Sequence, residues 1–149
     1  MALYRRFELD QPWYSPDNSK LLAEMPSVFR CPNGMPEATG RTHYVVSVGV
    51  DTAFPDASSV RLWDIKDGTG NTLLVVEDPE FSVPWAAPMD VSTEDWISHV
   101  KLSRENGPHS DGQFVLLGDG MVRFLRYDTD PKTLRALLLI SDGAPVGPF

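Results

Sequence analysis

Hydrophobic and polar positions along this chain predict a few strands and a few short helices. The clearest strand is expected at residues 43–50, which are rich in β-branched and aromatic residues and bounded by turn formers. A second strand is expected at residues 72–77, whose continuous apolar run indicates burial on both faces. Residues 60–63 alternate briefly between polar and apolar, which predicts a short edge strand.

The strongest local pattern is a β-hairpin in the last third of the chain. Two apolar runs, 114–117 and 121–125, flank a Gly-Asp-Gly turn at 118–120. An Asp-Gly pair supplies the positive φ angles that a tight hairpin turn requires. Val122 and Phe124 are expected on one face of the second strand, because side chains alternate along a strand.

Capping residues and apolar spacing predict three short helices, at residues 18–25, 96–102 and 131–138. Asp17 or Asn18 is the expected cap of the first helix, and Ser92 that of the second. Strands joined by short helices give an α+β fold class, an antiparallel β-sheet with a few short helices.

The chain length indicates one globular domain, since 149 residues can enclose a single core. Thirteen prolines and eleven glycines imply short elements joined by many turns. We expect an irregular N-terminal segment over residues 1–40, which includes a turn at Asn33-Gly34. A sheet core over residues 41–126 and a C-terminal helix and tail over residues 127–149 follow it.

The net charge of −8 argues against nucleic acid and anionic membrane surfaces as partners, because an acidic surface repels phosphates. Divalent cations and basic faces of proteins remain open. No apolar run approaches the roughly 20 residues of a transmembrane helix, so we expect no membrane insertion by this chain. The single cysteine, Cys31, cannot form an internal disulfide and is expected to be a small packed residue before a turn.

Two groups of residues carry candidate metal or acid–base chemistry. His109 and Asp119 stand at the two ends of the predicted arm and would meet if the preceding loop folds back over the hairpin. The alternative is that His109 bonds loop backbone while Asp119 forms the turn. The second group is Asp67, Asn71 and Glu77, with Asp64 beside it. Their oxygen atoms suit calcium, although their spacing is not that of an EF-hand.

For this second group, the alternative is an Asp-Gly turn at Asp67-Gly68 that Asn71 caps. The weak metal candidates are therefore Asp67, Asn71, Glu77, His109 and Asp119, and calcium is the only cofactor considered. Trp85 lies in a proline-bounded loop and is expected to be exposed. A binding module for a cation, a glycan or a peptide would require the loops around Asp67, Trp85 and His109 to converge at one end of the sheet.

No nucleophile elbow, phosphate loop or zinc-binding helix motif is present, and we expect no enzymatic activity. A hydrolase that uses His109 and Asp119 is the weaker alternative.

Residues 109–125 resemble the H-x9-DG signature of a large bacterial family of prepilin-like proteins with a domain of unknown function. His109, Asp119 and Gly120 carry this signature. Further stretches resemble the same family in the expected order, at residues 10–26, 63–72 with Glu77, 83–90 and 134–137. The signature positions in these stretches are Asp67, Gly68, Asn71 and Trp85.

The resemblance implies a pilin- or pseudopilin-like head. Family members usually carry a type IV pilin-like cleavage site and a long apolar helix, followed by a globular head on the outer side of the membrane. It therefore implies a non-catalytic structural or assembly role in a bacterial secretion-type (type II-like) or pilus-type system. Pilin-like subunits would be the partners, and the periplasmic side of the cell envelope the location. A gene that encodes only the head would place it in the cytoplasm.

The sequence departs from the family pattern at several places. The apolar helix is missing, so that either the chain was trimmed or the gene encodes a head alone. Gly70 and Met121 each stand where the family usually has serine, and Ser110-Asp111 replaces the usual Pro-Gly after the histidine.

Overall fold

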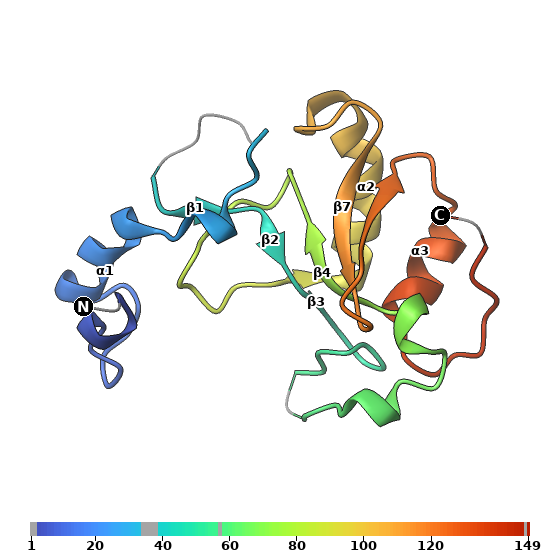
Figure 1. The fold of residues 1–149 in the computed structure, drawn as a ribbon, viewed down its shortest axis with the longest axis horizontal. Coiled ribbons are helices and arrows are strands. Elements are labelled where there is room, and N and C mark those ends of the chain that lie inside the picture. The colour runs from blue at the N-terminus through green and yellow to red at the C-terminus, as the bar shows by residue number, and fades with distance from the viewer. Residues whose placement is uncertain (1–2, 34–38, 57, 148) are drawn as a thin grey trace.

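The computed structural model describes residues 3–33, 39–56, 58–147 and 149. The chain is mixed α+β, with a main antiparallel sheet and a few short helices, which confirms the coarse prediction of an α+β class with an antiparallel sheet (Figure 1). Its main sheet has four antiparallel strands in the order β2-β4-β7-β8. Their bounds are Tyr44–Val45 for β2, Leu73–Glu77 for β4, Gly112–Leu117 for β7 and Val122–Arg126 for β8.

The single long strand predicted at residues 43–50 is divided between β2 of the main sheet and β3 of a smaller sheet. β1 (Arg41–Thr42) pairs antiparallel with β5 (Val83–Pro84), and β3 (Ser47–Val48) pairs parallel with β6 (Val91–Ser92). The prediction of one continuous strand was wrong, because successive pairs of residues in this region pair with different strands. Sequence alternation reports burial, and it does not report which strand supplies the hydrogen bonds.

The β7–β8 hairpin is confirmed, and its turn differs in detail from the prediction. The Leu117 N–H donates to the Met121 carbonyl, so that three residues form the loop. Only Gly120 has a positive φ, +86°, whereas Asp119 does not. This is the three-residue hairpin loop in which a left-handed residue follows a type I turn.

Helices α2 (Thr93–Asn106) and α3 (Pro131–Leu138) cover one face of the main sheet (Figure 1). The Ser92 hydroxyl caps α2 by accepting from the Asp95 N–H, as predicted. α2 extends further than predicted, through the fully buried Ser103. Trp96 of α2 and Leu137 of α3 are both 0% exposed and belong to the same core cluster as the inner side chains of the sheet.

An arm of short helical turns precedes the sheet and extends to one side of it (Figure 1). It holds α1 (Pro16–Leu21) and 3-10 turns at Leu3–Arg6, Leu22–Glu24 and Ser27–Phe29. The first helix begins two residues earlier than predicted, because Ser15 caps it and proline suits its first turn. The predicted cap Asn18 is buried inside the helix, where its amide donates to backbone carbonyls of the arm. Gly34 of the predicted Asn33-Gly34 turn lies outside the described residues.

The predicted edge strand at residues 60–63 is wrong. Leu62–Asp64 form a 3-10 turn instead, because the Asp64 carboxylate accepts from the Arg61 N–H and closes the turn. Another 3-10 turn, Thr69–Asn71, leads into β4 where a turn was predicted. In the part of the chain that the structure describes, none of the helices combines the length and apolar character needed to cross a membrane.

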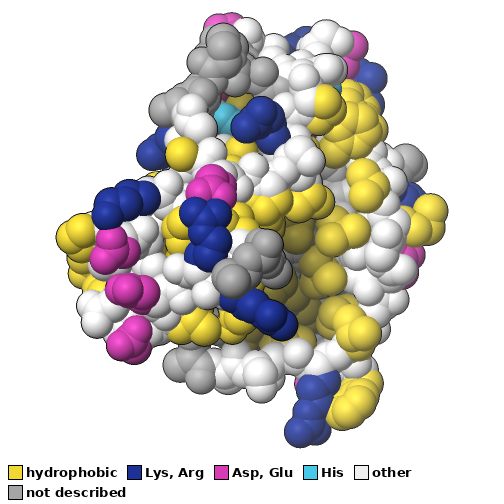
Figure 2. All heavy atoms as spheres, turned by 60° about the vertical axis from the view of Figure 1, so that its left-hand side comes forward, with side chains coloured by type: hydrophobic (Ala, Val, Ile, Leu, Met, Phe, Trp, Pro, Cys, Tyr) yellow, Lys and Arg dark blue, Asp and Glu magenta, His cyan; other side chains and the backbone are white. Residues whose placement is uncertain are grey.

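The face of the main sheet opposite α2 and α3 is only partly covered. Phe114 pairs with Phe124, and Leu116 with Val122, so these four side chains share that face. A groove of about 400 Å³ runs along it, and Val28 and Phe29 of the arm form its far wall. Figure 2, which brings the left-hand side of Figure 1 forward, shows hydrophobic side chains lining a hollow on this side of the molecule.

Candidate functional site

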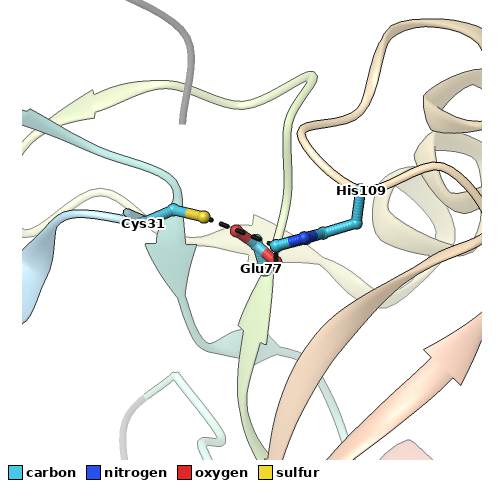
Figure 3. Close-up of side chains that lie close together, drawn as sticks. All are labelled: Cys31, Glu77 and His109. Atoms are coloured by element: carbon cyan, nitrogen blue, oxygen red, sulfur yellow. Dashed lines mark hydrogen bonds and ion pairs between the residues drawn. The ribbon is translucent and has the colours of Figure 1, made fainter. Parts of the chain in front are cut away.

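Three side chains that are distant in sequence meet at one end of this open face (Figure 3). Cys31 comes from the arm, Glu77 is the last residue of β4, and His109 lies in the loop before β7. The Cys31 Sγ is 3.4 Å from the His109 Nε2, and the same Nε2 is 3.3 Å from the Glu77 Oε2. The three donor atoms all lie within 4.8 Å of one another.

Glu77 is placed on the open face by the strand pairing. It lies opposite Tyr44 of β2, and its Oε2 accepts from the Phe114 N–H of β7 at 3.2 Å. The residue is 1% exposed, and its Oε1 is buried without a hydrogen-bond partner among the described residues. Burying an ionised carboxylate that lacks full compensation costs several kcal/mol. Glu77 is therefore a buried acid whose second oxygen is free to bind something else.

Cys31 reaches the site because the 3-10 turn Ser27–Phe29 brings the arm back over the sheet. The thiol is buried, and burial followed by the nearby Glu77 carboxylate raises its pKa to about 11. The Asn33 N–H and the Tyr44 hydroxyl act in the opposite direction through hydrogen bonds to the sulfur. With this raised pKa, the sulfur is a protonated thiol at neutral pH, and a protonated thiol is a poor nucleophile.

His109 is held edge-on against two rings of the open face. Its ring centroid is 5.0 Å from that of Phe114 and 6.4 Å from that of Phe124. Its side chain is 11% exposed. The imidazole therefore has a fixed orientation in which Nε2 faces the sulfur and the carboxylate together.

This arrangement differs from a nucleophile–histidine–acid triad. In a triad the nucleophile and the acid bond to opposite ring nitrogens, so that one accepts a proton while the other is held as N–H. Here Cys31 and Glu77 both approach Nε2. A single nitrogen cannot accept from the thiol and donate to the carboxylate at the same time, so Glu77 does not orient the ring from the opposite nitrogen as the acid of a triad does.

The structure brings together only two of the metal candidates predicted from the sequence, Glu77 and His109. Asp119 lies at the opposite end of β7 from His109, so a six-residue strand separates them by roughly 17–20 Å. The Asp119 carboxylate accepts from the Met121 N–H, which is its role in the hairpin turn. His109 and Asp119 therefore do not meet, and the alternative in which Asp119 forms the turn holds.

The acidic group before β4 does not converge either. Asp67 accepts from the Asp142 and Gly143 N–H groups at 2.8 and 3.0 Å, and Asn71 donates to the Asp67 carbonyl. These contacts tie the turn to the C-terminal segment. Gly68 adopts a φ of +92°, which favours glycine in this turn. β4 separates Asp67 and Asn71 from Glu77, so the predicted calcium group does not form.

Trp85 contacts the arm, and it also lines a cavity of about 420 Å³ beside the arm. Its ring stacks on Phe29 at 5.4 Å and meets Phe7 edge-on at 5.8 Å, and its Nε1 donates to the Leu22 carbonyl. The residue is half-buried, whereas the sequence predicted an exposed loop. Asp67 bonds the C-terminal segment, Trp85 bonds the arm, and His109 contacts Cys31 and Glu77, so the contacts of the described residues do not join these three loops in one site.

Cys31 is the member of the cluster that sequence reasoning missed. Its local context predicts a packed residue before a turn, and it is indeed buried. The spacing of these residues does not indicate the contact, because Cys31 is 46 positions from Glu77 and 78 positions from His109. The available indication was its chemistry, since the only thiol of the chain is also its softest ligand.

Comparison with known proteins adds no assignment to this geometry. No protein-family model, no curated protein and no solved structure matches the chain.

Proposed function

We propose that this chain is a non-catalytic, pseudopilin-like head that packs against protein partners in a bacterial secretion- or pilus-type assembly of the cell envelope. One observation carries the proposal, the uncovered apolar face of the main sheet. Val122 is 62% exposed there, and Phe114 and Phe124 are 43% and 40% exposed. Apolar side chains that gather on one uncovered face mark an interaction surface.

The groove on this face favours an apolar helix as the occupant. It is lined almost wholly by apolar side chains of β4, β7 and β8 and of the arm, including Val75, Leu116 and Val28. A helix laid in such a groove buries a stripe of side chains without requiring new backbone hydrogen bonds. The resemblance of residues 109–125 to prepilin-like proteins points to the apolar helix of a pilin-like subunit.

Two features of the candidate site support a non-catalytic role. Burial and the Glu77 carboxylate raise the pKa of the Cys31 thiol to about 11, which keeps it protonated. The sulfur and the carboxylate also converge on one histidine nitrogen, which is unsuited to general-base catalysis.

Site-specific photocrosslinking in the cells that naturally produce the chain tests the proposal. A photoreactive phenylalanine analogue replaces Val122 on the open face and, as a matched control, the exposed Lys101 on α2. Crosslinks from position 122 are expected to map by mass spectrometry to an apolar helical segment of a membrane-anchored subunit. Crosslinks to the same segment from position 101, or only to soluble proteins from position 122, would overturn the proposal.

A further inference from the structure

We propose that Cys31, Glu77 and His109 bind one zinc ion, through the sulfur, a carboxylate oxygen and Nε2 respectively. Three protein ligands leave one coordination position for water. The proposal does not rest on the pseudopilin-like function, because it follows from the cluster alone.

The spacing of the donor atoms fits the ion. Bond lengths of about 2.3 Å to sulfur and 2.0–2.1 Å to nitrogen or oxygen place neighbouring tetrahedral ligands about 3.3–3.6 Å apart. The observed separations are 3.4 Å for sulfur to Nε2 and 3.3 Å for Nε2 to the Glu77 Oε2. The remaining pair, sulfur and carboxylate, lies within 4.8 Å. Two of the three distances between the ligand atoms therefore match those of a tetrahedral zinc site.

The donor set selects the class of metal. Calcium and magnesium take oxygen ligands, and a buried thiol and imidazole suit neither ion. Thiolate, imidazole and carboxylate together are ligands of zinc. Among the described residues, this is the only group of three or more such side chains that could hold an ion.

Charge balance provides an independent argument. In the described part of the chain, no lysine or arginine forms an ion pair with Glu77, whose only such contact is with His109. A divalent cation would neutralise the Glu77 carboxylate and a Cys31 thiolate while His109 stays neutral. A bound cation also deprotonates a coordinating thiol, so Cys31 would bind the ion as a thiolate.

Contacts within the chain orient the three ligands. The Phe114 N–H holds the Glu77 Oε2, and the rings of Phe114 and Phe124 fix the plane of His109. Supporting contacts of this kind orient metal ligands in known sites. The Glu77 Oε1 is buried without a hydrogen-bond partner among the described residues, so this second oxygen is also available to an ion.

Bound zinc would join three separate segments, the arm, the end of β4 and the loop before β7. Metal binding to the native state alone adds to folding stability. At a hundredfold excess of free zinc over its dissociation constant, the unfolding midpoint should rise by about 5–10 °C.

Cobalt substitution tests the proposal without any variant. The full chain, free of affinity tag and stripped with EDTA, is titrated with Co²⁺ while its absorption spectrum is recorded. We expect a thiolate-to-cobalt charge-transfer band and tetrahedral d–d bands that saturate at one ion per chain and disappear when zinc is added. Because the chain has one cysteine, the charge-transfer band reports on Cys31 alone. A folded chain that shows no such band would overturn the proposal.

Variants assign the other two ligands. Cys31→Ser should abolish the charge-transfer band, and Glu77→Gln and His109→Gln should each weaken zinc binding at least about 10-fold. His99→Gln is the matched control, because His99 also contacts a buried carboxylate yet lies outside the cluster. Circular dichroism and the unfolding midpoint in EDTA identify variants that fail to fold. Zinc binding that is unchanged in folded Cys31→Ser, or weakened equally in His99→Gln, would contradict the assignment.

Discussion

Glu77 and Asp78 are adjacent in the chain, both are almost fully buried, and each lies beside a histidine. The Asp78 Oδ2 is 2.8 Å from the His99 Nδ1, and its Oδ1 accepts from the Glu80 N–H at 3.1 Å. Both oxygens of Asp78 are therefore satisfied. Glu77 has one satisfied oxygen and one without a hydrogen bond.

The difference shows how a structural acid can be told from a candidate ligand. A carboxylate whose two oxygens are both bonded within the chain has no capacity left for an ion. Asp78 closes the loop after β4 and is complete without any ligand. Glu77 belongs to a cluster with a thiol and an imidazole, and its second oxygen has no hydrogen-bond partner in the described part of the chain. Burial alone does not separate the two residues, whereas hydrogen-bond satisfaction does.

The largest effect on stability should come from removing Asp78, the acid whose two oxygens are both hydrogen-bonded. Asp78→Ala is expected to lower the free energy of unfolding by about 3 kcal/mol, because the Glu80 N–H and His99 lose their acceptor inside the protein. Urea unfolding in EDTA at neutral pH measures this loss. Asp128→Ala, which removes only an exposed pair with Arg126, should stay close to the wild type. A loss below about 1 kcal/mol for Asp78→Ala would show that the pair is not structural.

The next effect concerns the reactivity of the Cys31 thiol, which the Glu77 cluster has and the Asp78 pair lacks. At pH 8, a pKa of about 11 leaves roughly 0.1% thiolate, and an ordinary thiol has at least about a hundred times more. Cys31 in the folded, metal-free chain should therefore react with a disulfide reagent at least about 100-fold more slowly than in the urea-unfolded chain. This ratio corresponds to about 2.7 kcal/mol. Equal rates in the two states would show that Cys31 is neither buried nor electrostatically suppressed.

A smaller effect is expected when Glu77 loses its charge. In EDTA, Glu77→Gln should change the free energy of unfolding by less than about 1 kcal/mol. The amide oxygen can still accept from the Phe114 N–H, and the cost of burying a charge disappears. Urea unfolding beside Asp78→Ala gives the direct comparison. A loss as large as that of Asp78→Ala would place Glu77 among the structural acids.

Local patterns predicted the elements that depend on neighbouring residues. The hairpin followed from two apolar runs around a Gly-Asp-Gly turn, and α3 followed from the apolar spacing of residues 131–138. The prediction of one continuous strand in this part of the chain was wrong, because three successive pairs of residues between 41 and 48 pair with three different strands. Choice of partner depends on distant contacts, which one sequence does not display.

The candidate site was partly visible from the sequence. Glu77 and His109 were both named as ligands, but each was grouped with the wrong neighbours, Asp67 and Asp119. Those groupings joined residues close in sequence, whereas β4 separates Glu77 from Asp67 and β7 separates His109 from Asp119. Cys31 needed the fold of the arm, since a 3-10 turn and the packing of Phe29 on Trp85 bring it over the sheet.

The smallest effect is a pH dependence that separates the buried pair from an exposed one. Burial raises the pKa of Asp78 above its ordinary value, although His99 opposes this shift. The folded state then holds its proton more tightly than the unfolded state, so this residue's contribution to stability falls as pH rises from about 4 through the raised pKa. The stability of the wild type relative to Asp78→Asn should therefore decline over that interval.

Arg126 lowers the pKa of Asp128, and the wild type relative to Asp128→Asn should instead gain stability as pH rises toward 4. Urea unfolding of the three proteins between pH 3 and 7 measures both slopes, and slopes of the same sign would contradict the buried position of Asp78.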